Sequence, residues 1–97
     1  MILIDAGTLR EILHRYRAIY RWKDGWHVHD LARQLFPNVV QITGEVLDRA
    51  RALCDDSPKL MARDALHAAV VLHEGFDEIC SYDRDFDVIA TIRRIEP

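Results

Sequence analysis

The stretch that decides the fold is "RDALHAAVVLHEGFDEICSYDRDFD", residues 63–87. Its first half is rich in alanine and apolar on nearly every helical face, which predicts a buried helix that Gly75 ends. Residues 78–82 then have the composition of a short strand. Three aspartates follow within five residues: Asp83, Asp85 and Asp87. This pattern raises the question of whether the aspartates form a solvated turn or a binding site for a cation.

The rest of the chain alternates between short strands and helices. Apolar or β-branched runs at 1–4, 39–42 and 92–95 predict strands. Helical spacing of apolar residues predicts helices over 8–22, 26–36 and 45–54. The alternation indicates an α/β fold of three layers, α/β/α, with a mostly parallel sheet. A length of 97 residues favours one domain over 1–97.

Local signals also predict where the helices begin and end. Thr8 followed by Glu11 matches a capping box, which places a helix start at Thr8. Residues 23–25, Lys-Asp-Gly, predict the break after this helix. Thr43 is the expected N-cap of the helix over 45–54.

The bulk composition excludes several classes of protein. A net charge of −3 does not indicate a general electrostatic grip on nucleic acid. No apolar run approaches the roughly 20 residues of a membrane span, and the start of the sequence lacks the basic region of a signal peptide. Cys54 and Cys80 form no CxxC pair, so both are expected to be reduced. These features favour a cytoplasmic protein.

Acidic residues far apart in the sequence are predicted to converge. Asp64 stands in the first turn of the buried helix, and Asp83 follows a strand directly. Helix starts and the carboxyl ends of strands share one edge of a parallel sheet, where Glu11, near another helix start, can join them. Carboxylates gathered in a cleft repel one another unless protons or a cation intervene. Mg²⁺ or Mn²⁺ prefers such oxygen ligands and suits phosphodiester hydrolysis.

Each of these residues also has a purely structural interpretation. Glu11 can be a helix cap, and Asp64 can complement a helix dipole. Asp87 is expected to lie in a solvated turn, and Asp85 remains open between the two roles. His67, one turn after Asp64, is expected to pack in a helix interface rather than bind metal.

Residues 63–97 closely resemble the carboxyl half of a PIN domain of the VapC toxin type, with "DALHAA" and "DRDFD" as its marks. "LREILHRYRA", residues 9–18, resembles the glutamate-bearing helix of that family. The resemblance implies a metal-dependent endoribonuclease, the toxin of a type II toxin–antitoxin system. It implies RNA as substrate and a small VapB-like antitoxin as partner. It also implies that Mg²⁺ or Mn²⁺ is held by four residues: Glu11, Asp64, Asp83 and, as a helper, Asp85.

The chain departs from the family at its start. PIN domains of this type open with a strand ending in aspartate, then a helix, before the glutamate helix, whereas ten residues precede Glu11 here. In one reading the initial strand and helix are missing. In the other, residues 1–5 are that strand and Asp5 is its aspartate. The short spacing from Asp5 to Glu11 favours the first reading, whereas the look of "MILID" as an opening strand favours the second; we prefer the first.

A missing initial strand has physical consequences. Its neighbours in the sheet would be unpaired and apolar surface would be bared, so we expect a homodimer or higher oligomer. Loss of one metal ligand would weaken metal binding. The alternative function is therefore a catalytically inactive PIN remnant that binds an antitoxin or assembles with itself.

Overall fold

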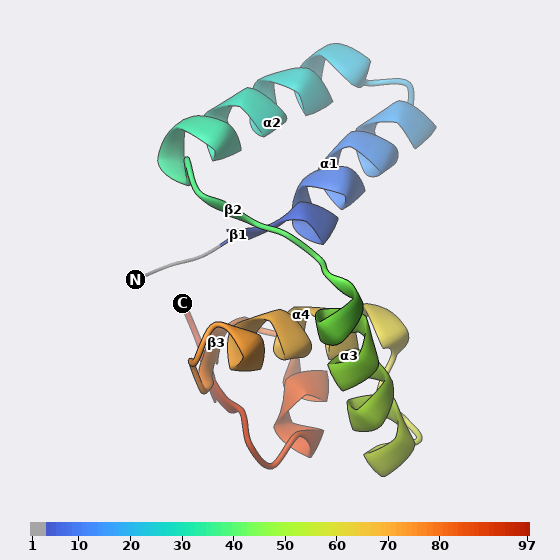
Figure 1. The fold of residues 1–97 in the computed structure, drawn as a ribbon. Helices are drawn as coiled ribbons and strands as arrows, with labels where there is room; N and C mark the ends of the chain where they lie inside the picture. The colour runs from blue at the N-terminus through green and yellow to red at the C-terminus, as the bar shows by residue number, and fades with distance from the viewer. Residues whose placement is uncertain (1–3) are drawn as a thin grey trace. The chain divides into compact units, whose positions relative to one another are not determined.

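The computed structural model describes residues 4–97 and divides the chain into two compact units, one ending at Ile42 and one spanning Thr43–Pro97. Each unit contains helices and a pair of parallel strands (Figure 1). The expectation of a single domain over 1–97 stays a prediction.

The first unit is a helical hairpin flanked by two short strands. β1 (Ile4–Asp5) leads directly into α1 (Ala6–Ala18), which packs against α2 (Trp22–Leu35). β2 (Val39–Val40) follows and pairs with β1 in parallel. The predicted strand at 39–42 is present in shortened form. Of the predicted strand at 1–4, Ile4 belongs to β1, and positions 1–3 lie outside the described residues.

The start of α1 differs from the prediction. Its N-cap is Asp5, whose Oδ1 accepts hydrogen bonds from the Thr8 N–H at 2.8 Å and from the Thr8 hydroxyl at 3.3 Å. The predicted capping box of Thr8 and Glu11 is wrong, because both residues lie inside the helix. Aspartate caps a helix as well as threonine does. Asp5 stands three residues before Thr8, so its carboxylate accepts the Thr8 N–H and the helix begins earlier than predicted.

The break between α1 and α2 also lies earlier than predicted. Tyr20 adopts a left-handed conformation with φ 60°. Its N–H donates to the Arg17 carbonyl at 3.2 Å, and the Arg21 N–H donates to the Tyr16 carbonyl at 2.9 Å. This pair of bonds is the Schellman motif that ends a helix. The predicted break at 23–25 is wrong, since these residues form the first turn of α2.

The second unit begins with two packed helices. α3 (Gly44–Asp56) starts at Thr43, whose Oγ1 accepts from the Val46 N–H at 3.3 Å, so the predicted cap is confirmed. α4 (Ala62–His73) packs against α3. Gly75, with φ 83°, follows α4 in a second Schellman motif, which confirms the predicted helix end.

The remaining elements form the edge that carries the acidic turn. β3 (Glu78–Cys80) pairs in parallel with β4 (Arg93–Ile95), and the 3₁₀ helix η1 (Arg84–Val88) lies between them in sequence. The core of this unit joins the small residues of α4 to apolar residues of the other elements. Its buried members are Val46, Ala50, Leu60, Ala65, Ala68, Ala69, Val70, Phe86, Ile89 and Ile92.

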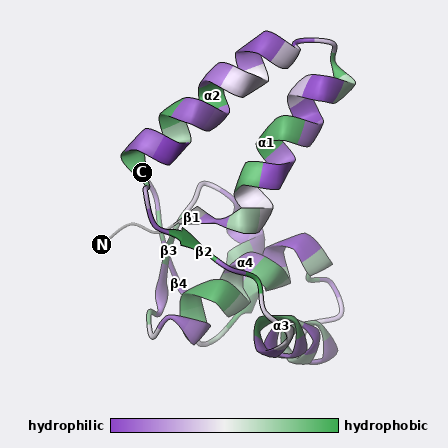
Figure 2. Ribbon diagram, turned by 45° about the horizontal axis from the view of Figure 1, so that its top comes forward, coloured by the Kyte–Doolittle hydropathy of each residue, from purple (hydrophilic) through white to green (hydrophobic). Residues whose placement is uncertain are grey.

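The predicted α/β class is confirmed, and both strand pairs are parallel as expected. These features are compatible with a three-layer α/β/α fold. Polar and apolar residues alternate along α1 and α2 (Figure 2), as the helical spacing predicted. Among residues 4–97, no helix has the length and apolar character needed to cross a membrane. Cys54 and Cys80 are both free thiols.

Gly25 is required by the close approach of α1 and α2. It is buried, and a Cβ added there would collide with the Cβ of Tyr16 and lie 3.0 Å from its Cγ. We therefore expect Gly25→Ala to lower the free energy of unfolding by about 1–3 kcal/mol, measured by urea denaturation, despite the higher helix propensity of alanine.

Gly44 provides the matched control for this substitution. It is also helical, but nothing lies within 4 Å of the position of its added Cβ. Gly44→Ala should change the stability by no more than about 0.5 kcal/mol. Equal effects of the two substitutions would contradict the packing explanation.

Candidate metal centre

Asp64 is the buried member of the acidic site. It is the third residue of α4, in the first turn, where a negative charge complements the helix dipole. The residue is only 4% exposed, which is unusual for an aspartate. α4 therefore places a carboxylate in the interior of the second unit.

Asp83 and Asp85 lie on the turn that follows β3. Asp83 is the N-cap of η1, and its Oδ1 accepts from the Asp85 N–H at 2.9 Å. The Asp83 N–H in turn donates to the Ser81 hydroxyl at 3.0 Å. Both aspartates are exposed, whereas Phe86 beside them is 5% exposed and anchors the turn in the core.

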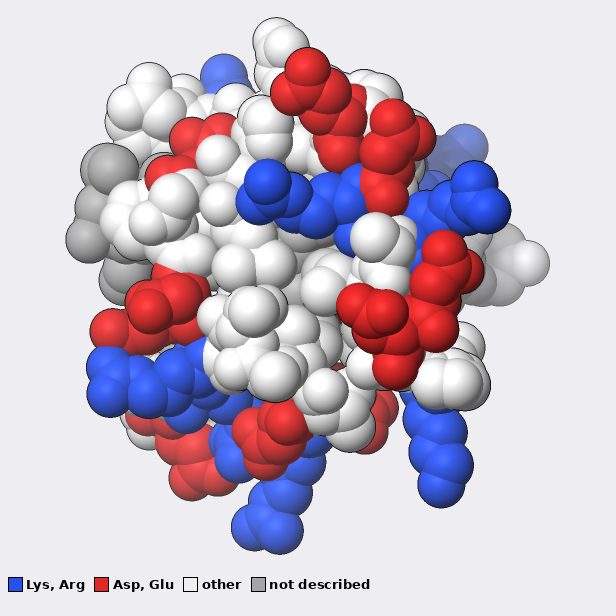
Figure 3. Space-filling view, turned by 60° about the horizontal axis from the view of Figure 1, so that its bottom comes forward, with Lys and Arg blue, Asp and Glu red and all other residues white. Residues whose placement is uncertain are grey.

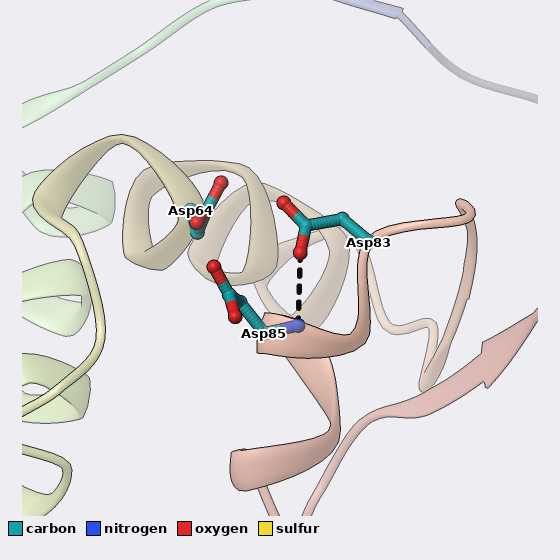
Figure 4. Close-up of side chains that lie close together, drawn as sticks. All are labelled: Asp64, Asp83 and Asp85. Atoms are coloured by element: carbon teal, nitrogen blue, oxygen red, sulfur yellow. Dashed lines mark hydrogen bonds between the residues drawn. The ribbon is translucent and has the colours of Figure 1, made fainter.

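The three carboxylates point toward one another (Figure 4). One oxygen from each of Asp64, Asp83 and Asp85 lies within 4.8 Å of the others. Two ligands on opposite sides of Mg²⁺ are about 4.2 Å apart, twice the usual metal–oxygen distance. The limit of 4.8 Å exceeds this separation, so the carboxylates would have to move closer together to bind one such ion, and an all-oxygen donor set suits Mg²⁺ or Mn²⁺.

The electrostatics of the site disfavour three ionised carboxylates. Burial raises the pKa of Asp64 above its ordinary value, and the neighbouring charges of Asp83 and Asp85 raise it further. Arg63, whose Nε lies 4.0 Å from Asp64 Oδ1, and His67 act in the opposite direction and only partly offset this increase in the pKa. A divalent cation would relieve the repulsion among the three carboxylates that Arg63 and His67 do not offset.

Asp87 does not belong to this cluster. Its carboxylate accepts two hydrogen bonds from Arg94, from Nε at 2.9 Å and from Nη2 at 3.3 Å. The hydrogen bond from Arg94 lowers the pKa of Asp87. Asp87 is exposed and lies outside the acidic cluster, as expected for a residue of a solvated turn, and it also forms an ion pair with Arg94 that the sequence did not reveal.

Glu11 and Asp5 lie in the first unit. Glu11 is half-buried in α1, in the second turn of the helix rather than the first. Asp5 is 7% exposed and caps α1, which is sufficient to explain an aspartate there. The structure brings together Asp64, Asp83 and Asp85. Participation of Glu11 or Asp5 in the same site stays a prediction.

The charges on the face drawn in Figure 3 do not segregate by sign. Lysine and arginine side chains alternate with aspartate and glutamate side chains around uncharged residues. On this face the mixture of signs fits the net charge of −3.

Comparison with known proteins identifies the class. The PIN domain model matches residues 2–92, which is most of the chain. The chain belongs to the PIN-domain family.

Within that family the similarity is to proteins of the VapC type. The chain is 35% identical over 94 residues to VapC ribonuclease Mb1869c of Mycobacterium bovis. It has the same identity over the same length to ribonuclease VapC13 of Mycobacterium tuberculosis. Each alignment covers 97% of this chain and 72% of the relative. No solved structure matches the chain. The resemblance inferred from the sequence motifs is thereby confirmed.

The raised pKa of Asp64 makes stability depend on pH in a defined direction. Between the unfolded and folded pKa values the folded state binds more protons, so this contribution to stability is complete below the unfolded value of about 3.8 and is lost as the pH rises through the raised folded pKa. Without metal, we expect Asp64→Asn to be more stable than the parent at pH 7, with the difference shrinking toward pH 3. Urea denaturation across this pH range measures it. A difference that does not vary with pH would contradict the assigned cause.

Proposed function

We propose that this protein is a metal-dependent endoribonuclease and the toxin component of a type II toxin–antitoxin system. The observation that carries the proposal is the convergence of Asp64, Asp83 and Asp85 in a chain of the PIN-domain family. The names of both relatives, VapC ribonucleases, supply the substrate class.

In this proposal Asp64, Asp83, Asp85 and Glu11 hold Mg²⁺ or Mn²⁺, and Asp5 is the alternative acidic ligand from the first unit. The ion, when bound, activates water and offsets negative charge on a phosphodiester. The family resemblance supports Glu11, since its helix "LREILHRYRA" matches the glutamate-bearing helix of the family. The close approach of their carboxylates supports the three aspartates.

The three aspartates have different roles because they differ in burial. Asp64 is fixed by α4 and by its buried surroundings, so it defines the floor of the site. Asp83 is oriented by its contact with the Asp85 N–H. The exposure of Asp83 and Asp85 leaves the outer side of the site open to a polymer such as RNA. Hydrolysis in this arrangement needs no nucleophile from the protein.

Partners and assembly follow from the same family argument. We propose that a small VapB-like antitoxin neutralises the protein and that the chain forms a homodimer or higher oligomer. Several large apolar side chains of the first unit are exposed and are available for such contacts: Ile19, Trp22, Trp26, Val28, Leu31 and Leu35. An RNA substrate and two free cysteines favour action in the cytoplasm.

The alternative of an inactive remnant that only binds an antitoxin or itself is not favoured. Both relatives are named as ribonucleases, and the aspartates expected for a metal site lie close together. An inactive remnant would have no reason to keep a buried carboxylate beside two others, at a cost to stability.

A bound metal ion should stabilise the folded chain. At Mn²⁺ concentrations of 100 times the Kd, the gain is about 2.7 kcal/mol, which corresponds to roughly 10 °C or more in Tm for a chain of this size. The double change Asp64→Asn/Asp83→Asn should abolish this shift in a thermal denaturation assay. Asp55→Asn, an exposed change on α3, is the control and should keep it. No Mn²⁺-dependent shift in the parent would overturn the proposed metal site.

RNA cleavage tests the activity itself. We expect the parent to cleave total RNA with Mg²⁺ or Mn²⁺ and to lose activity with EDTA. Asp83→Asn should reduce the rate by more than about 100-fold, because changes to groups that merely support metal ligands already cost 10- to 100-fold. Asp55→Asn should keep the parent's rate. Cleavage that persists in EDTA would argue against metal dependence, and no cleavage with metal bound would favour the inactive remnant.

A further inference from the structure

We infer that Arg94 is a positioning residue: its guanidinium fixes the segment Ser81–Asp87, which carries Asp83 and Asp85, and thereby sets the affinity of the site for a divalent cation. This inference rests on the proposed function, since it concerns the geometry of the same acidic site. Arg94 lies outside the cluster of three aspartates that would hold the cation.

Arg94 uses all three of its nitrogens. Nε and Nη2 donate to the two carboxylate oxygens of Asp87 at 2.9 and 3.3 Å. Nη1 donates to the Ser81 carbonyl at 3.2 Å and to Glu96 Oε1 at 2.9 Å. The Arg94 side chain is 12% exposed, whereas its partners Asp87 and Glu96 are 51% and 56% exposed. The bidentate fork on Asp87 and the part-buried bond to the Ser81 carbonyl give the guanidinium one defined geometry.

The contacts fall on both ends of one short segment. Ser81 is its first residue and Asp87 its last, and a single planar group touches each of them. β4 supplies the fixed base, because Arg94 lies opposite Ile79 in the parallel pair and the Ser81 N–H donates to the Ile95 carbonyl at 2.9 Å. Phe86 anchors the segment from the core side. Asp83 and Asp85 therefore stand on a segment held at both ends.

Loss of this clamp should loosen the short contact between Asp83 Oδ1 and the Asp85 N–H. The exposed carboxylates would then sample more orientations, and only some would face Asp64. A cation that needs all three groups would bind less tightly, because binding would have to order the segment first.

The charge of Arg94 acts in the opposite direction to this positioning effect. A positive guanidinium near an acidic site repels a divalent cation, so removal of the charge alone should tighten metal binding. Positioning predicts that removal weakens binding. The two explanations therefore differ in sign, and a measurement of affinity separates them without reference to RNA cleavage.

The test uses the full chain and Mn²⁺, with affinity measured by calorimetry. We expect Arg94→Met to weaken Mn²⁺ binding by about 10- to 100-fold, the range found for residues that orient metal ligands. Arg94→Lys keeps the charge but cannot form the planar fork, so it should also weaken binding, by at least about 5-fold.

Arg93→Met is the matched control. Arg93 is the preceding residue of β4, and its side chain, 72% exposed, pairs with Glu78 at 2.7 Å rather than with the segment. Its removal should leave the Mn²⁺ affinity within about 2-fold of the parent's. Amide hydrogen exchange at Asp85 provides a metal-free readout: it should accelerate in both Arg94 variants and not in Arg93→Met.

The outcomes can be told apart. The inference is supported if the parent binds Mn²⁺ and the Arg94 variants bind it more weakly. Unchanged or tighter Mn²⁺ binding by a folded Arg94 variant overturns it, even if the Tm falls, because Arg94 would then be merely structural or an electrostatic antagonist. If Arg94→Met does not fold, Arg94→Lys carries the same test. No Mn²⁺ binding by the parent would overturn the proposed function itself, and this inference with it.

Discussion

Repulsion between carboxylates is the constraint on which the candidate site depends. Asp64 is buried in the first turn of α4, and oxygens of Asp83 and Asp85 lie within 4.8 Å. Such an arrangement raises the pKa of Asp64 and works against the stability of the metal-free fold. The surrounding structure must therefore hold the groups together. α4 does so from one side by burial, and the turn after β3 does so from the other by hydrogen bonds.

The turn after β3 owes its shape to two kinds of contact. Within the turn, the Ser81 hydroxyl accepts from the Asp83 N–H and Asp83 Oδ1 accepts from the Asp85 N–H, which is the usual way in which short polar side chains shape a turn. Outside it, Phe86 enters the core and Arg94 bridges to Asp87. The hydrogen bonds of Ser81 and Asp83 determine the conformation of the turn. The contacts of Phe86 and Arg94 fix the position of the turn relative to α4.

The acidic site could be predicted in part from the sequence, because two simple rules fix where its aspartates lie. A carboxylate in the first turn of a helix and another just after a parallel strand share one edge of a sheet, and Asp64 and Asp83 follow this rule. The helix boundaries were harder. Gly25 resembled a helix breaker, but it is needed for contact with Tyr16, a tertiary reason that no local pattern contains. The role of Arg94 was hidden similarly, since its partners lie up to 13 residues away.

The errors share a physical cause. Asp5 and Thr8 are both good caps, and local propensity alone could not decide between them. Tyr20 is an unusual residue for a left-handed helix end, so the break there carried no sequence signal. Periodicity located the elements well because burial of apolar faces dominates the energetics. Boundaries depend on single hydrogen bonds of about 1 kcal/mol and are correspondingly harder to predict.

The cap formed by Asp83 also bears on how many coordination positions an incoming phosphate would find. Since Oδ1 of Asp83 already accepts the Asp85 N–H, this carboxylate favours monodentate over bidentate ligation. Mg²⁺ prefers six ligands and tends to retain water at several of them. If a divalent cation were bound as proposed, a site that contributes single oxygens would leave its remaining positions to water or to the oxygens of a nucleic acid backbone.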